Sequence, residues 1–385
     1  MPVCCKEASD KGNAEAQYNL GDMYQSGNGV KQDYYEATKW FLKAAKQGDA
    51  FSQFKLGAMF YLGDGVKKDY VKAKDWFLKS AEQNIAEAQF CLGGMYFRGE
   101  GVKQDYFEAF KWYQKAYEQG NEFAQVELAC MYMEGVGVKQ NYSRAFMYSQ
   151  KPAEFGNLKA QYNLGYLYIK GFAVKQDFSR AFKWFKESAE NGYADSQFYL
   201  GVMYSQGQGV SQDYLKAIEW WQKAAEQGLS SAQFNLGIIY SNGFGVKQDY
   251  TKAIEWWQKA AEQGVTDAQY NLGVTYDGGI GVKQDYSKAL VWYQKAAEQG
   301  HAKAQHNLGV MYENGQGVKQ DYFKAVEWYQ KASEQGLAGA QFSLGNMYYF
   351  GQGVRQDYTK AKEYYGLACD NKNQSGCDMY RKLNQ

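Results

Sequence analysis

The apolar positions of this 385-residue chain recur with a period of 36 residues. Within one period they fall four residues apart, as at Ala232, Leu236 and Tyr240, which indicates an amphipathic helix. A Gly-x-Gly-Val segment follows, and glycine there supplies the positive φ that a helix end or a tight turn needs. Asp249 then stands at the N-cap position of a second helix. Each period therefore predicts one helix–turn–helix repeat.

The period is kept through ten cycles without an insertion. Two short helices bury little by themselves, whereas stacked neighbours bury a continuous core. The sequence thus predicts an all-α protein that forms a single repeat array over residues 1–385. Within it we expect an N-terminal half-repeat cap at 1–13, ten repeats over 14–373 and a C-terminal capping helix at 374–385. The period is marked by the core leucines Leu20, Leu56, Leu92, Leu128, Leu164, Leu200, Leu236, Leu272, Leu308 and Leu344.

The repeat resembles that of the Sel-one-like repeat (SLR) family, a relative of the tetratricopeptide repeat. The resemblance is clearest at residues 232–264, which read AQFNLGIIYSNGFGVKQDYTKAIEWWQKAAEQG. It extends from about residue 14 to 370 and combines the 36-residue period, the Gly-x-Gly-Val loop and the Ala-Gln…Leu-Gly start of the first helix. What it implies is a right-handed α-solenoid superhelix and a role as an adaptor in protein assemblies.

Charge and hydropathy narrow the class of partner. With 43 basic and 42 acidic side chains the net charge is +1, which leaves no basic footprint for nucleic acid. The sequence contains no run of 18 apolar residues, so no transmembrane segment is predicted. The first residues lack the apolar stretch of a secretory signal, although a leader removed earlier would leave the same sequence. The expected partner is therefore a protein or a peptide.

One face of the first helix changes chemistry from repeat to repeat. In the first repeat it is represented by Glu15, Asn19, Asp22 and Ser26, whose spacing of four, three and four places them on one side of a helix. By resemblance to tetratricopeptide superhelices, this face lines the concave groove that binds the partner. Free variation of a solvated surface would give the same pattern, so both interpretations stay open.

The asparagines of this face are the candidate peptide-binding residues. An amide both donates and accepts, so a row of amides can pair with an extended backbone of any sequence. The similar asparagine ladder of tetratricopeptide grooves supports this role, and the alternative is an exposed helix residue without one. Phe51 and Phe123 add candidate apolar contacts on the same face. The asparagines are Asn19, Asn163, Asn235, Asn271 and Asn307.

Two other recurrences predict structural roles. A glutamine three residues before each core leucine recurs in all ten repeats, at positions such as Gln17 and Gln53. Its constancy indicates a hydrogen bond between repeats, because a binding site rarely needs one contact ten times. Tryptophans of the second helix are interpreted as core side chains, since aromatic stripes at helical spacing usually pack inside. They are Trp40, Trp76, Trp112, Trp184, Trp220, Trp256, Trp292 and Trp328.

Cys369 and Cys377 are separated by seven residues and span the loop before the capping helix. Bacterial cysteine-rich SLR proteins join adjacent helices with a similar spacing, and that resemblance implies a disulfide here, although nine repeats lack the pair. The alternative is two free thiols in a reducing cytosol. The compartment stays undetermined: periplasmic or secreted if the pair is oxidised and a leader was removed, otherwise cytoplasmic. No metal-binding spacing joins Cys4, Cys5, Cys91 and Cys130.

Catalysis has little support. His301 and His306 are five residues apart and so not on one helix face. A Ser-x-x-Lys motif, Ser52 to Lys55, matters because some cysteine-rich relatives are labelled β-lactamases or penicillin binders, yet its usual partner motifs are missing. We expect an interaction scaffold rather than an enzyme, with no metal and no cofactor. The alternatives are a hydrolase or binder of cell-wall or β-lactam compounds, and a structural spacer.

The fourth repeat departs most from the pattern. Pro152 near the end of its second helix predicts a break or a kink. Drift within a redundant array and a functional bend both explain the departure, and the sequence does not separate them. The departures are Val126, Ala129, Asn141, Tyr148, Ser149 and Pro152.

Overall fold

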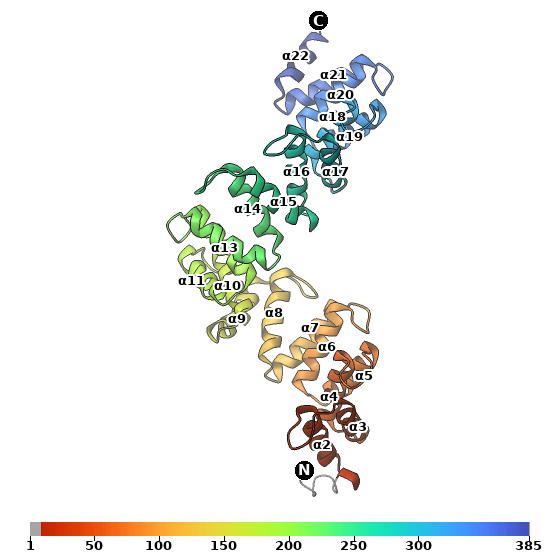
Figure 1. The fold of residues 1–385 in the computed structure, drawn as a ribbon, viewed down its shortest axis with the longest axis vertical. Coiled ribbons are helices and arrows are strands. Elements are labelled where there is room, and N and C mark those ends of the chain that lie inside the picture. Colours follow the sequence, from red (N-terminus) through yellow and green to blue (C-terminus); the bar gives the residue numbers. More distant parts are fainter. Residues whose placement is uncertain (1–8, 385) are drawn as a thin grey trace. The chain divides into compact units, whose positions relative to one another are not determined.

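The computed structural model describes residues 9–384, which contain 21 helices and no strand (Figure 1). They form ten helix–turn–helix repeats of about 36 residues that pack as a solenoid, as predicted. Twenty of the helices have 13 residues each, and the last, α22, has nine. The predicted N-terminal cap at 1–13 lies mostly outside the described residues.

The chain divides into two compact blocks, each holding five repeats. The N-terminal block is Met1–Tyr193. Each first helix in it packs on the second helix of its own repeat, and that helix packs on the next first helix. Its helices are α2 (Ala14–Ser26), α3 (Tyr34–Lys46), α4 (Ala50–Leu62), α5 (Tyr70–Glu82), α6 (Ala86–Arg98), α7 (Tyr106–Glu118), α8 (Glu122–Glu134), α9 (Tyr142–Glu154), α10 (Leu158–Lys170) and α11 (Phe178–Glu190).

The C-terminal block is Ala194–Gln385. It repeats the same packing and ends in the predicted capping helix, α22. Its helices are α12 (Ala194–Gln206), α13 (Tyr214–Glu226), α14 (Ser230–Asn242), α15 (Tyr250–Glu262), α16 (Thr266–Gly278), α17 (Tyr286–Glu298), α18 (Ala302–Asn314), α19 (Tyr322–Glu334), α20 (Ala338–Phe350), α21 (Tyr358–Asp370) and α22 (Gln374–Lys382).

Local signals fix the helix ends where the sequence predicts them. Gly243 ends α14 with a φ of 72°, a left-handed conformation that glycine adopts without strain. Gly245 also has a positive φ, and a Cβ there would lie 2.5 Å from the Cβ of Tyr214 in the preceding repeat. Asp249 caps α15 by accepting from the backbone N–H of Lys252 at 3.0 Å. The loop therefore reverses the chain direction and also packs against the preceding repeat.

The core of each repeat joins a buried leucine, a small residue and a ring. Leu164 is fully buried, and the next residue, Gly165, faces the ring of Phe185. A Cβ on Gly165 would lie 2.8 Å from that ring, closer than real side chains approach. The glycine therefore lets the two helices of a repeat pack closely. The buried rings at the Phe185 position are Phe41, Phe77, Tyr113, Trp221, Trp257, Tyr293, Tyr329 and Tyr365.

The prediction that the recurring tryptophans are core was wrong for all but Trp40. The other seven are half-buried, because the fully buried position is the next residue along the helix. Trp256, for example, packs against the core with one side while the Lys259 ammonium lies 4.2 Å from its ring centroid. A lysine stem can cover an aromatic surface and keep its charge in water, so this position is a covered edge of the core.

Pro152 does not break the fourth repeat, since α9 runs through it to Glu154. Proline lacks the N–H that would bond to the carbonyl four residues earlier, that of Tyr148. The side chain of Gln125 supplies the missing donor, with its Nε2 3.0 Å from the Tyr148 oxygen. The predicted break was therefore wrong, and a glutamine from α8 supplies the hydrogen bond to Tyr148 that the helix itself cannot form.

Candidate functional site

The candidate site is the first-helix face, defined as the positions equivalent to Glu15, Asn19, Asp22 and Ser26 in each repeat. Its side chains project from α2, α4, α6, α8 and α10 in the N-terminal block and from α12, α14, α16, α18 and α20 in the C-terminal block. The residues behind this face hardly change along the chain, whereas the face itself does.

The recurring glutamine ties each first helix to its surroundings. Gln53 is buried, and its Nε2 donates to the carbonyl of Ala45 in the preceding repeat at 3.2 Å. Its Oε1 accepts from Gln83 of its own repeat at 2.8 Å. The same pair of hydrogen bonds recurs in later repeats, for example at Gln233. The predicted inter-repeat hydrogen bond is confirmed, and it fixes the orientation of the first helices.

The candidate asparagines occupy different environments. Asn19 is exposed, and Asn235 and Asn271 are half-buried with side-chain amides that make no hydrogen bond to any described residue. Asn307 lies beside His306, with 3.4 Å between its Oδ1 and Nδ1 of the ring. Asn163 is only 1% exposed and donates to the Cys130 sulfur at 3.5 Å. A ladder of available amides is therefore best supported at Asn235 and Asn271.

The two candidate phenylalanines are both exposed on this face. Phe51 is 54% exposed and Phe123 is 66% exposed. Each ring lies beside an aromatic residue of the preceding repeat: Phe51 beside Tyr18 at 6.3 Å between centroids, and Phe123 beside Phe90 at 6.1 Å. Such rings offer rigid apolar area to a partner at low entropic cost.

Polar residues of the face bridge neighbouring repeats in the N-terminal block. Lys55 donates to Asp22 and to Gln25, both at 3.1 Å, so α4 is linked to α2. Lys159 of α10 likewise reaches the Glu127 carboxylate of α8 at 3.0 Å. These bridges hold the surface in a defined arrangement before any partner arrives.

A cavity of about 290 Å³ opens on the face of the N-terminal block. The sequence interpretation missed it, although one signal was present: Gly94 stands where the other nine repeats carry a side chain. At its edge Arg98 donates to Glu100 at 2.8 Å and to the Tyr61 hydroxyl at 3.0 Å. The cavity is lined by Tyr61, Phe77, Phe90, Cys91, Gly94, Phe97, Arg98, Tyr113 and Glu127.

Burial and pairing set the protonation of the groups around this cavity. Burial raises the pKa of the Cys91 thiol to about 11, so this thiol is protonated at neutral pH and is a weak nucleophile. Burial also acts to raise the pKa of Glu100, but hydrogen bonds from Arg98 and Tyr61 outweigh it and lower that pKa. The cavity therefore presents a neutral, largely aromatic wall with an ion pair at its edge.

The residues considered for catalysis are not assembled into a reactive group. Ser52 is fully buried, and its Oγ has no hydrogen-bond partner, whereas Lys55 turns to the face. His306 does approach Ser343, with 3.4 Å between Nε2 and Oγ. Ser343 lies in the middle of α20, however, where backbone N–H groups are bonded within the helix and cannot form an oxyanion hole. His301 acts as the N-cap of α18 by accepting from Ala304 at 3.1 Å.

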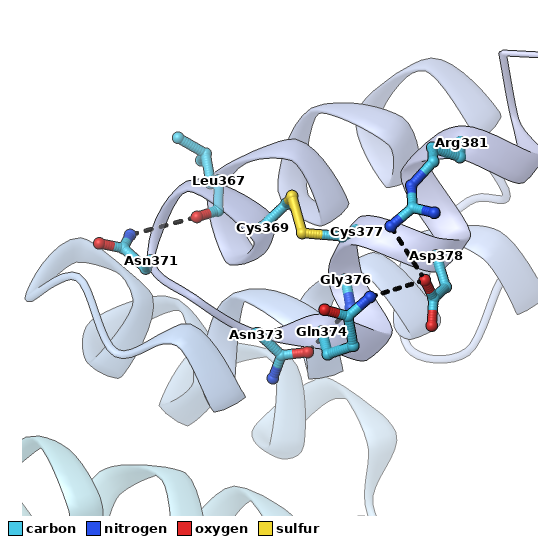
Figure 2. Close-up of a disulfide and its surroundings, with 9 residues drawn as sticks. All are labelled: Leu367, Cys369, Asn371, Asn373, Gln374, Gly376, Cys377, Asp378 and Arg381. Atoms are coloured by element: carbon cyan, nitrogen blue, oxygen red, sulfur yellow. Dashed lines mark hydrogen bonds and ion pairs between the residues drawn. A yellow bond between two sulfur atoms is a disulfide. The ribbon is translucent and has the colours of Figure 1, made fainter.

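The predicted disulfide joins Cys369 of α21 to Cys377 of α22, with their Cα atoms 4.5 Å apart (Figure 2). Next to it Asn373 caps α22 by accepting from the Gly376 N–H at 2.8 Å. The cross-link and the cap together fasten the last helix to the final repeat. Of the other cysteines, Cys91 and Cys130 are free thiols, and Cys4 and Cys5 lie outside the described residues.

Across residues 9–384, no three histidine, cysteine, aspartate or glutamate side chains gather in a way that would hold a metal ion. No helix in the same range combines the length and the apolar character needed to cross a bilayer.

Comparison with known proteins places the repeat in context. The Sel1 repeat model matches ten consecutive segments. A protective antigen, c5321, present in uropathogenic Escherichia coli strains and displaying an SLR fold, is 37% identical, with 99% of this chain and 89% of that chain covered and a TM-score of 0.63. A Sel1 repeat protein from Oxalobacter formigenes is 35% identical over 80% of this chain and 90% of its own, with a TM-score of 0.62. No curated protein matched. The matched segments are 14–49, 50–85, 86–121, 123–154, 158–193, 194–229, 230–265, 266–301, 302–337 and 338–373.

Proposed function

The chain belongs to the Sel1 repeat family, and from this premise we propose that it is a scaffold that binds a protein or an extended peptide on its first-helix face. Proteins built from Sel1 repeats generally mediate protein–protein interactions and are generally not enzymes. The proposal for this chain adds the surface and the kind of contact, namely amides that pair with a peptide backbone and exposed rings that bind its side chains.

The observation that carries the proposal is the contrast between a constant frame and a changing face. The recurring glutamine and the buried leucine are present in all ten repeats, whereas the Glu15 position becomes Phe51 in the second repeat and Phe123 in the fourth. A surface without a partner has little reason to expose large rings, because exposed apolar groups favour association. The rings at these positions therefore support a binding surface over a spacer.

The half-buried amides of the C-terminal block support peptide binding in particular. Asn235 and Asn271 occupy the same position in consecutive repeats and make no hydrogen bond to a described residue. Amides in that state keep both a donor and an acceptor for a ligand. An extended backbone presents alternating donors and acceptors, so it can satisfy such a row irrespective of its side chains.

The test is affinity capture from lysate followed by mass spectrometry, with three baits. One is the intact chain, and the second carries Asn235→Ala, Asn271→Ala and Asn307→Ala. The matched control has Gln258→Ala, Gln294→Ala and Gln330→Ala, which removes three exposed amides from the second helices of the same repeats. We expect a partner retained by the intact chain and by the glutamine control and lost with the asparagine variant. Equal retention by all three baits would contradict binding through these amides.

A further inference from the structure

Helix α6 contains two adjacent glycines, and only one of them is explained by packing. A Cβ on Gly93 would lie 2.8 Å from the Tyr113 ring, so Gly93 is required by the close approach of α7. A Cβ on Gly94 would meet only the guanidinium nitrogens of Arg98, at 3.1 and 3.2 Å, and these form the far end of a flexible side chain. Gly94 lies in the interior of a helix, where glycine destabilises relative to alanine. The fold itself does not require this residue.

What Gly94 does provide is open space on the first-helix face. It lines the cavity of about 290 Å³ together with Cys91, another small side chain. At the Gly94 position every other repeat carries a larger side chain. Those residues are Asp22, Ala58, Cys130, Tyr166, Val202, Ile238, Val274, Val310 and Asn346.

The lining of the cavity specifies an uncharged occupant. Five of its nine lining residues are aromatic, and the two charged ones are already paired within the chain. Arg98 is held by Glu100 at 2.8 Å, and Glu127 is held by Lys159 at 3.0 Å. A charged ligand group would find no unpaired counter-charge, and its desolvation would oppose binding. A ring, by contrast, gains edge and face contacts with the aromatic wall.

The size of the cavity and the surface beside it point to a side chain of a larger ligand. Pockets for free drug-sized ligands and cofactors begin at about 300 Å³ and extend to about 1,000 Å³, so this cavity is at the small end. Phe90 lines it, and the exposed ring of Phe123 lies 6.1 Å from Phe90. The apolar surface thus continues from the cavity onto the open face, where the neighbouring residues of a peptide would lie.

We propose that this cavity receives one aromatic side chain of a peptide bound along the first-helix face. The inference rests on the proposed function and adds a specificity determinant to it, because the backbone contacts of asparagines carry no sequence preference. The second, third and fourth repeats form the determinant, with Gly94 as the residue that keeps it open.

The test compares three full-length chains in selections from a peptide library with acetylated N-termini and amidated C-termini. Gly94→Val narrows the cavity with the side chain that Val202, Val274 and Val310 place at the same position, so the helix is expected to fold. The control, Ala58→Val, makes the equivalent change in the second repeat, where the residue does not line the cavity. Thermal unfolding of all three chains establishes that they are folded.

We expect the intact chain and the Ala58→Val chain to select peptides that share one aromatic residue, and Gly94→Val to lose that preference. Replacing the aromatic residue of a selected peptide by alanine should weaken binding to the intact chain about 10- to 100-fold, and binding to Gly94→Val hardly at all. The proposed role of the cavity would be contradicted if aliphatic or charged residues were selected instead, or if Gly94→Val bound the same peptides with the affinity of the intact chain. Either result would leave the proposal of peptide binding in place. If none of the three chains retains a peptide, the proposed function fails as well.

Discussion

The fourth and fifth repeats lie side by side in the N-terminal block and solve the same packing problem differently. In the fifth, Gly165 leaves room for the ring of Phe185, which is fully buried. In the fourth, the ring is replaced by Ser149, whose hydroxyl donates to the Ala145 carbonyl at 2.8 Å, and the glycine is replaced by Ala129. Both changes belong together, because a methyl group is tolerated only where no ring approaches.

The two repeats also differ in how they use the recurring glutamine. Gln161 of the fifth repeat donates to the Ala153 carbonyl of the preceding repeat at 3.1 Å, as most repeats do. Gln125 of the fourth donates instead to the Tyr148 carbonyl that Pro152 leaves without its usual donor. The comparison teaches that the frame of a repeat changes through linked pairs of residues, such as Ala129 with Ser149 and Gln125 with Pro152.

The largest effect on stability is expected for Ser149→Phe, which restores the ring without removing the methyl group of Ala129. Overpacking of this kind costs about 1–3 kcal/mol, and the hydrogen bond to Ala145 is lost as well. Adding Ala129→Gly should recover most of the loss. Thermal unfolding of the full-length single and double variants, monitored by circular dichroism, measures the difference in their stability. If the double variant is no more stable than Ser149→Phe, the two positions are not coupled.

A somewhat smaller loss is expected for Gly165→Ala in the fifth repeat. The new Cβ would lie 2.8 Å from the Phe185 ring, and the resulting overpacking is partly offset by the better helix propensity of alanine, so that about 1–2 kcal/mol remains. The matched control is Ala129→Gly in the fourth repeat, which loses about 1 kcal/mol of propensity and relieves no clash. Chemical denaturation of both variants checks the prediction, and stabilisation by Gly165→Ala would contradict the close approach.

Gln125→Ala should cost about 1–2 kcal/mol, because it leaves the part-buried Tyr148 carbonyl without a donor. The cost should fall by about 1 kcal/mol in a Pro152→Ala background, where the restored N–H bonds to Tyr148 within α9. A double-mutant cycle on unfolding free energies measures this coupling. Strictly additive effects would mean that the glutamine does not substitute for the missing helical bond.

The smallest effect is expected on the face itself. Asn235→Ala and Asn271→Ala remove side chains that make no hydrogen bond to a described residue, whereas Asn307→Ala removes contacts with His306, Tyr270 and Tyr293, partly offset because alanine favours the helix. Each change should alter the unfolding free energy by no more than about 0.5 kcal/mol. Differential scanning calorimetry of the triple variant tests this, and a large drop in its transition temperature would assign the asparagines to the frame instead.

The sequence predicts most of the fold because local signals and the repeat agree. The 36-residue period, the Gly243 turn and the Asp249 cap give the helix ends directly, and the constancy of the glutamine gives its structural role. The sequence prediction assigned the recurring tryptophans to the core, whereas the buried ring is that of the next residue. A helical stripe does not by itself show which of two adjacent rings, such as Trp256 and Trp257, is the buried one. Only the packed helices resolve that.

The candidate site was less accessible to sequence reasoning. Variation along the face is visible from the repeats, but burial is not: Asn163 is buried and donates to Cys130, whereas Asn235 at the same position is half-buried. The cavity was missed because it forms where Gly94 lacks a side chain and because its walls come from three different repeats. Likewise, the hydrogen bond from Gln125 to the carbonyl that Pro152 leaves without a donor depends on a contact between α8 and α9, which the local sequence pattern does not predict.

The most direct test of peptide binding on the first-helix face is isothermal titration calorimetry with the tightest peptide from the library. The peptide is titrated into the intact chain, into the Asn235, Asn271 and Asn307 triple alanine variant, and into the Gln258, Gln294 and Gln330 control. Loss of two or three backbone hydrogen bonds should raise Kd about 10- to 100-fold in the asparagine variant, with the control unchanged. Equal Kd values for all three chains would contradict the account.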